Sequence, residues 1–226
     1  MFDVRCSTFD VRCSPPEPFS DPAVEQPVRK LFLLSPAKVS GARAGYLLNP
    51  QAAFPLAREF QAHGLPLADV FAFASGLYFR GKITYARRFC DTTCGCIRVI
   101  TTNAGLLPPE TRLHPDTLRA FGTVDISADD ERYLAPIRRD AQALAGAMHP
   151  AGHAILLGSI ATAKYRDVLL QVFGDRLVFP QDFVGRGDMS RGALMLRAAA
   201  AGQELSYASV AGAVLSGPRA KRIAEM

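Results

Sequence analysis

The chain has 226 residues, of which 49% are hydrophobic and 21% are charged, and its formal net charge is +5. This composition is typical of a globular protein and excludes a fibrous or mostly disordered chain. No apolar run reaches the length of a membrane span, and the sequence does not open as a signal peptide would. We therefore expect a cytoplasmic protein without a membrane partner.

The first 29 residues differ from the rest in composition. They contain a tandem repeat, FDVRCST followed by FDVRCSP, and then a proline-rich acidic stretch. Seven residues are too few for a repeat that stacks into a solenoid. Such polar sequence buries too little apolar surface to offset the entropy lost on ordering. We predict a disordered leader over residues 1–29 and a single α/β domain over residues 30–226.

Short apolar runs alternate with helical patterns after the leader. The runs predict buried strands, because they are apolar throughout rather than alternating. They cover residues 30–36, 68–76, 96–105, 152–159 and 175–181. Helices are predicted at residues 49–64, 82–89, 129–148, 161–174 and 188–202. This alternation indicates βαβ units and a three-layer α/β/α sandwich around a mainly parallel sheet.

Ligands of such sheets bind beyond the carboxyl ends of the strands. Five polar segments are predicted to gather there, at residues 35–45, 74–82, 101–110, 158–164 and 182–192. The candidate binding residues in these segments are Ser35, Lys38, Ser75, Tyr78, Arg80, Lys82, Asn103, Ser159, Lys164, Gly185, Arg186, Gly187, Ser190 and Arg191.

These segments contain no complete phosphate-binding motif. GSIATAK lacks the second glycine that a Walker loop has before its lysine. After GRGDMSRG, Ala193 stands where a Walker loop has its lysine. Within it, Ser190 stands where a dinucleotide-binding fingerprint has its third glycine. Helix N-terminal amides beside Lys164 or Arg191 can still hold an anion. A positive net charge also fits a phosphate-bearing partner, nucleotide or nucleic acid. The simpler interpretation, compatible with the first, is that Ser159 and Asp188 cap their helices.

Other chemistries have little support in the sequence. Cys90, Cys94 and Cys96 form C-x3-C-x-C, which is not a usual zinc spacing, and the four histidines form no pair near them. We predict no metal site and structural cysteines in the reduced state. No motif implies a cofactor, and no G-x-S-x-G elbow is present.

Asp188 is the candidate catalytic residue. It lies between Arg186 and Arg191, and its carboxylate could activate water, hold a sugar hydroxyl or only pair with arginine. Gly185 and Gly187 are expected to allow a tight turn, after which Asp188 caps a helix starting at Met189. The same residues, Arg186-Gly187-Asp188, also match the cell-adhesion tripeptide Arg-Gly-Asp. Adhesion needs a protruding extracellular loop, so a tight turn into a capped helix argues against that function.

Three stretches, residues 31–41, 76–89 and 99–111, and the segment 177–197 resemble a group of uncharacterised bacterial α/β proteins. That group is similar at fold level to uracil-DNA-glycosylase-like domains, including the one in archaeosine synthase. The resemblance implies a nucleotide- or nucleic-acid-related protein that acts on an N-glycosidic bond or a modified base. A non-catalytic binding module and a small-molecule hydrolase remain alternatives. The matching residues are Ser35, Lys38, Leu77, Tyr78, Phe79, Lys82, Tyr85, Gly105, Leu106, Gly185 and Gly187.

Overall fold

The computed structural model describes residues 27–90 and 95–213. The repeat and most of the predicted leader lie outside these residues. Residues 27–29 of the predicted leader are described, and two of them contact the domain: Val28 accepts a backbone hydrogen bond from His149, and Arg29 accepts one from His153. The described part of the domain therefore begins just before the first strand.

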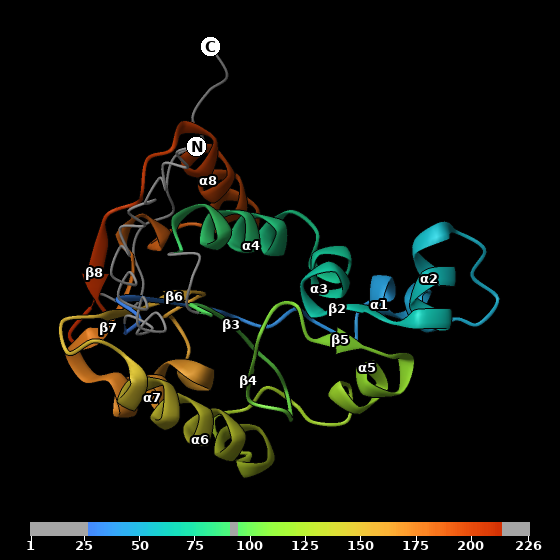
Figure 1. The fold of residues 1–226 in the computed structure, drawn as a ribbon, viewed down its shortest axis with the longest axis horizontal. Coiled ribbons are helices and arrows are strands. Elements are labelled where there is room, and N and C mark those ends of the chain that lie inside the picture. Colours follow the sequence, from blue (N-terminus) through green and yellow to red (C-terminus); the bar gives the residue numbers. More distant parts are fainter. Residues whose placement is uncertain (1–26, 91–94, 214–226) are drawn as a thin grey trace, which may run out of the picture.

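A six-stranded sheet forms the centre of the described structure (Figure 1). Its order is β4-β3-β1-β6-β7-β8. The four inner strands are parallel, and the two edge strands, β4 and β8, are antiparallel to their neighbours. The bounds are β1 (Lys30–Leu34), β3 (Ile97–Ile100), β4 (Leu106–Leu107), β6 (His153–Leu157), β7 (Leu177–Pro180) and β8 (Tyr207–Ser209).

Long helices cover both faces of the sheet, as Figure 1 shows. On one face lie α4 (Leu77–Phe89) and α8 (Asp188–Ala201), and on the other lie α6 (Glu131–Ala147) and α7 (Ala163–Phe173). The inner strands are apolar on both sides for this reason: Phe32 and Leu33 point to opposite faces of β1, and both are fully buried. The predicted three-layer α/β/α sandwich is confirmed.

Smaller elements lie beyond the ends of these strands. They are α1 (Ala42–Leu48), α2 (Pro55–His63), β2 (Leu65–Pro66), α3 (Leu67–Ser75), β5 (Arg112–Leu113) and α5 (Pro115–Phe121). β2 and β5 form a separate antiparallel pair. Short 3-10 turns, η1 (Gly174–Arg176) and η2 (Gln181–Phe183), precede and follow β7. The strand predicted at residues 68–76 is wrong, because this stretch forms helix α3.

Helices α4 and α8 touch through their backbones. A Cβ atom on Gly81 would lie 2.6 Å from the carbonyl oxygen of Gly192. A Cβ atom on Gly192 would lie 2.8 Å from the carbonyl oxygen of Leu77. Glycine at both positions therefore sets the close approach of the two helices and fixes the relative position of their first turns.

A disulfide joins Cys90, just after α4, to Cys96, just before β3. The prediction that these cysteines are reduced is therefore wrong for this pair. The sequence could not reveal the bond, because three closely spaced cysteines do not indicate which of them pair. Cys94, like Cys6 and Cys13, lies outside the described residues.

Candidate functional site at the carboxyl edge of the sheet

Four parallel strands end at one edge of the sheet, which we call the carboxyl edge. Their last residues are Leu34, Ile100, Leu157 and Pro180. Buried polar residues follow two of them directly: Ser35 after β1 and Thr101 after β3. Four helices also begin at this edge. Two of them, α7 and α8, follow the end of a strand. The other two, α4 and α6, end near the start of the next strand and therefore begin at the opposite edge from that start. The carboxyl edge thus collects strand ends and helix starts.

Lys82 is the most unusual residue of this edge. Its side chain comes from α4, and the residue is only 1% exposed. The ammonium group donates to the carbonyl oxygen of Ser35 at 3.0 Å and to its hydroxyl at 2.6 Å, and it lies 3.9 Å from the centre of the Tyr78 ring. Burial lowers the pKa of Lys82 to about 7, although the nearby Asp188 carboxylate favours the charged form. Lys82 is therefore poised to change charge near neutral pH.

Tyr165 connects the ends of β1 and β6. Its hydroxyl accepts a hydrogen bond from the Ser159 backbone N–H at 2.9 Å and also bonds the Ser35 side chain. Gly158 makes this possible, because a Cβ atom there would lie 2.8 Å from both the Ser35 Cβ atom and the Tyr165 hydroxyl. Burial raises the pKa of Tyr165, so the hydroxyl keeps its proton.

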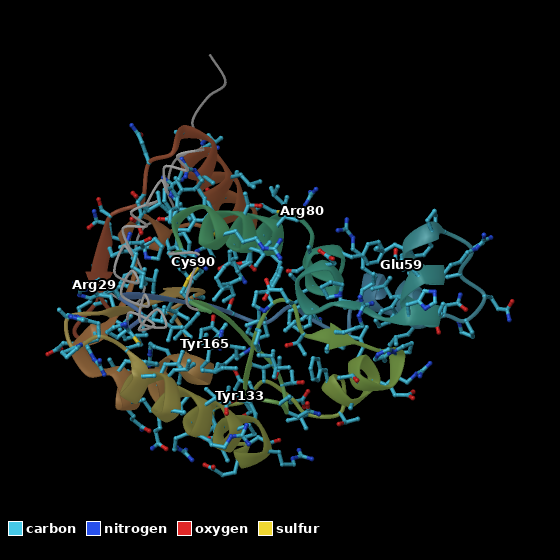
Figure 2. All side chains as sticks on the ribbon, in the orientation of Figure 1. Arg29, Glu59, Arg80, Cys90, Tyr133 and Tyr165 are labelled. Atoms are coloured by element: carbon cyan, nitrogen blue, oxygen red, sulfur yellow. A yellow bond between two sulfur atoms is a disulfide. The ribbon has the colours of Figure 1, made fainter. Side chains whose placement is uncertain are left out.

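Two further tyrosines place hydroxyls in the interior near this edge. Tyr133 is fully buried, and its hydroxyl has no hydrogen-bond partner among the residues described, whereas the hydroxyl of Tyr78, which is 7% exposed, lies next to the Arg191 guanidinium. Burial raises the pKa of both hydroxyls. For Tyr78 this effect is larger than that of the Arg191 guanidinium, which stabilises the phenolate and so lowers the pKa. Figure 2 shows Tyr133 and Tyr165 on the helices that cover the same face of the sheet. A buried hydroxyl without a partner is costly, and it is typical of functional positions.

We expect Tyr133→Phe to raise the free energy of unfolding by about 1 kcal/mol, because it removes a buried polar group that has no partner to lose. The matched variant Tyr165→Phe should lower it by about 1–2 kcal/mol, since it leaves the Ser159 N–H unpaired. Urea unfolding of the two variants measures both effects. Equal destabilisation by the two variants would show that the Tyr133 hydroxyl makes a bond as good as that of Tyr165.

Asp188 and Arg191 face each other in the first turn of α8. The Arg191 guanidinium lies 3.6 Å from the Asp188 carboxylate and donates twice to the carbonyl oxygen of Phe183, at 3.0 and 3.1 Å. This confirms the predicted pairing of the two residues. The predicted cap is wrong: α8 begins at Asp188 itself, and Gly187 occupies the N-cap position. Asp188 instead supplies the negative charge that a helix start favours.

The two glycines of this turn have different roles. Gly185 has a φ of +73°, in the left-handed region, so it provides the predicted tight turn. Gly187 has a φ of −81°, which any residue can adopt. Arg186 donates to the Ser190 hydroxyl at 3.2 Å across the same turn. Ser159 does not cap α7, because Thr162 holds that position.

The remaining predicted residues do not join the cluster formed by Ser35, Tyr78, Lys82, Tyr165, Asp188 and Arg191. Asn103 donates its side-chain amide to the carbonyl oxygen of Ala120 at 2.9 Å, toward α5. Ser75 ends α3. Lys38, Arg80 and Lys164 are exposed, and Figure 2 shows Arg80 on the outer side of α4. These three cations are available to a ligand only at the surface of the edge.

Arg43 was not predicted as a site residue, but it lies at the start of α4. A Cβ atom on Gly76, which has a φ of +61° and precedes α4, would lie 2.7 Å from a guanidinium nitrogen of Arg43. Tyr133 and Tyr165, which lie on the buried faces of their helices, were also missed as site residues. A tyrosine on such a face is the one signal that could have indicated a buried hydroxyl.

The helix starts at this edge carry an unusual charge pattern. Helices normally favour acids and capping side chains at their first turn, because the N-terminus is partly positive. Neither α4 nor α7 has an acid in its first turn, and none of α4, α7 and α8 has a side-chain cap among the described residues. Instead Arg80 lies in the first turn of α4, Lys164 in that of α7 and Arg191 in that of α8. This arrangement suits an anion held between the helix starts.

A pocket of about 430 Å³ lies elsewhere, at the start of β3. Its lining includes the Cys90–Cys96 disulfide, Arg87, Arg98 and Glu110. This is the amino end of the strand, away from Ser35 and Lys82. We place the candidate site at the carboxyl edge, because the buried polar groups and helix starts converge there.

Comparison with other proteins adds no relative: no family model, no curated protein and no solved structure matches this chain. Within residues 27–90 and 95–213, no three His, Cys, Asp or Glu side chains are grouped as a metal site would require. Over the same residues, no helix combines the length and the apolarity needed to cross a membrane.

Proposed function

We propose that this protein binds a phosphate-bearing ligand, a nucleotide or a nucleic acid, at the carboxyl edge of its sheet. The observation that carries the proposal is the charge pattern of α4, α7 and α8. Three long helices direct their partly positive ends to one edge; each has a cation in its first turn, and only that of α8 also has an acid, Asp188. A bound phosphate offsets this concentration of positive charge and supplies acceptors for the free amides.

We further propose that the ligand's N-glycosidic bond, or a modified base, is the point of reaction. The resemblance to uracil-DNA-glycosylase-like domains motivates this step, and Asp188 is the group that would activate water. Its carboxylate is exposed and is oriented by Arg191 at 3.6 Å. Asp188→Asn should then retain ligand binding but lose turnover. Unchanged turnover would remove Asp188 from catalysis, and binding without turnover in the parent would favour a non-catalytic module.

Binding should weaken steeply with salt if the partner is a nucleic acid. A single strand that engages three phosphates should lose roughly 20-fold in affinity between about 50 and 200 mM salt, because bound counterions are released. Fluorescence anisotropy with a panel of labelled oligonucleotides and nucleotides measures the slope. An absence of binding to the whole panel, or binding that ignores salt, would contradict the proposal and favour a small-molecule hydrolase.

The cytoplasmic location expected from the sequence remains a prediction. The Cys90–Cys96 disulfide is an argument against it, because disulfides are rare in a reducing cytosol. Cell fractionation with thiol alkylation at lysis tests the location and the bond together.

A further inference from the structure

Lys82 and Ser35 bring an amine and a hydroxyl together inside the protein. The Lys82 nitrogen lies 2.6 Å from the hydroxyl oxygen of Ser35 and 3.0 Å from its carbonyl oxygen. A buried lysine ordinarily pairs with a carboxylate, because a buried charge needs a counter-charge. The hydrogen-bond acceptors that the described residues offer to Lys82 are instead these two oxygens of Ser35. The contact therefore has a chemical character that a purely structural lysine does not need.

Charged and titratable groups from three helices surround this amine. The Tyr78 ring, from α4 itself, lies 3.9 Å from the nitrogen, and the Tyr165 hydroxyl of α7 bonds the Ser35 side chain. On α8, the Asp188 carboxylate favours the charged amine and the Arg191 guanidinium favours the neutral one. Burial is the largest effect and lowers the pKa of Lys82 to about 7. At pH 8 most of the amine is therefore neutral and can accept a proton.

The hydrogen bonds around Ser35 leave its own proton one direction. The Tyr165 hydroxyl accepts from the Ser159 backbone N–H at 2.9 Å, so it is free to donate its proton to the Ser35 oxygen. The Ser35 hydroxyl then donates to the neutral Lys82 amine over the same 2.6 Å. A hydroxyl held by a neighbouring base is an activated nucleophile, and serine with lysine is one recurring form of this pair.

Ser35 also stands where a substrate can arrive. It is the first residue after β1, at the carboxyl edge, and it keeps 5% of its exposure, whereas Lys82 behind it keeps 1%. A Cβ atom on Gly158 would lie 2.8 Å from the Ser35 Cβ atom and 3.2 Å from its hydroxyl oxygen. A larger residue at this position would thus press on the hydroxyl. This tight packing favours a short acyl group over a long one.

We infer that Ser35 is the nucleophile, and Lys82 its general base, in the hydrolysis of small carboxylic esters. The Ser35 oxygen bonds to the acyl carbon while its proton passes to the Lys82 nitrogen. The bond between the acyl carbon and the alcohol oxygen breaks, and Lys82 gives the proton to the leaving alcohol. Water then attacks the acyl group on Ser35 and gives a proton to Lys82, which returns it to the Ser35 oxygen as the acid departs. No step uses a phosphate, so the inference is independent of the proposed function.

The test is the reaction of the full chain with p-nitrophenyl acetate. Released p-nitrophenolate measures the rate, and peptide mass spectrometry locates the acetyl group. The parent should release p-nitrophenolate in a burst and carry an acetyl group on Ser35. The burst rate should rise with pH around a midpoint near 7, because only the neutral Lys82 amine can take the Ser35 proton.

Three variants separate the roles of the two residues. Ser35→Ala should lose both the burst and the acetyl group at this position. Lys82→Met keeps the hydroxyl but lacks the base, so the burst rate should fall roughly 100-fold or more and lose its midpoint near pH 7. Ser127→Ala is the matched control, since that hydroxyl only accepts from the Asp129 backbone N–H between α5 and α6, and it should react as the parent does. Thermal unfolding checks that each variant is folded.

The peptide map of the parent decides the inference even if a variant does not fold. Acetylation confined to residues other than Ser35, Lys82 included, would overturn it. A parent without a burst, or equal bursts from the parent and a folded Lys82→Met, would overturn it as well. None of these results bears on the proposed function, because nucleotide and oligonucleotide binding are measured separately.

Discussion

Replacing Gly81 by alanine should lower the free energy of unfolding by roughly 3 kcal/mol, and replacing Gly192 should do the same. At both positions a Cβ atom would lie under 3 Å from backbone atoms of the facing helix. Backbone atoms cannot rotate away as a side-chain end can, so α4 must move off α8. Tyr78 and Arg191 lie on these two helices, so ligand binding should weaken as well. Urea unfolding and titration measure the two effects.

Gly146→Ala is the matched control. Gly146 lies inside α6, has no positive φ, and a Cβ atom there would meet nothing within 4 Å. Alanine should therefore raise the free energy of unfolding by about 0.5–1 kcal/mol, since it restricts the unfolded chain and favours the helix. A Gly81→Ala variant that is as stable as Gly146→Ala would show that α4 and α8 can separate at little cost.

Lys82 should make the stability of the protein rise with pH above neutrality. Burial lowers the pKa of the Lys82 amine in the folded protein from 10.5 to about 7. Below pH 7 the amine is therefore charged in both the folded and the unfolded protein, and the folded protein bears the full cost of burying that charge. Between these two pKa values the unfolded chain binds a proton that the folded protein has released. The free energy of unfolding therefore increases with pH, by a slope that approaches about 1.4 kcal/mol per pH unit and by about 2 kcal/mol in all from pH 7 to 9.

The Lys82→Met variant lacks this titration. The difference in free energy of unfolding between parent and variant should therefore shift in favour of the parent by about 2 kcal/mol from pH 7 to 9. Urea unfolding at pH 6, 7, 8 and 9 gives the difference directly. Lys164→Met, an exposed position on α7, should follow the parent at every pH. Parallel curves for the parent and Lys82→Met would mean that Lys82 keeps its ordinary pKa in the folded protein.

Much of the fold follows from the apolar runs. β1, β6 and β7 were predicted because parallel strands covered on both faces are apolar throughout. The run at residues 68–76 has the same character but forms α3, since an apolar run of this length also fits a buried helix. Ala68, Ala72 and Ala74 favour the helix. β2, β4 and β5 have only two residues each, too few to leave a pattern.

The site was predicted in outline, because topology alone indicates which strand ends meet. Ser35 and Arg191 were expected from their places in loops after strands. Lys82 was expected in a loop but reaches Ser35 from inside α4, because that helix packs on β1. Arg43 could not be predicted: nothing near it in the sequence indicates that it will lie on Gly76. Contacts of this kind arise from packing between segments distant in the chain.

The central position of β1 has a consequence for how the chain folds. Phe32 of β1 pairs with Ile97 of β3 on one side and with Ile155 of β6 on the other. Loop closure must therefore span a large part of the chain before the first strand gains both neighbours, which slows folding. During synthesis, β1 leaves the ribosome long before β6 exists. A truncated chain that ends before His153 would leave one edge of this largely apolar strand unpaired, and an unpaired strand edge is a template for aggregation.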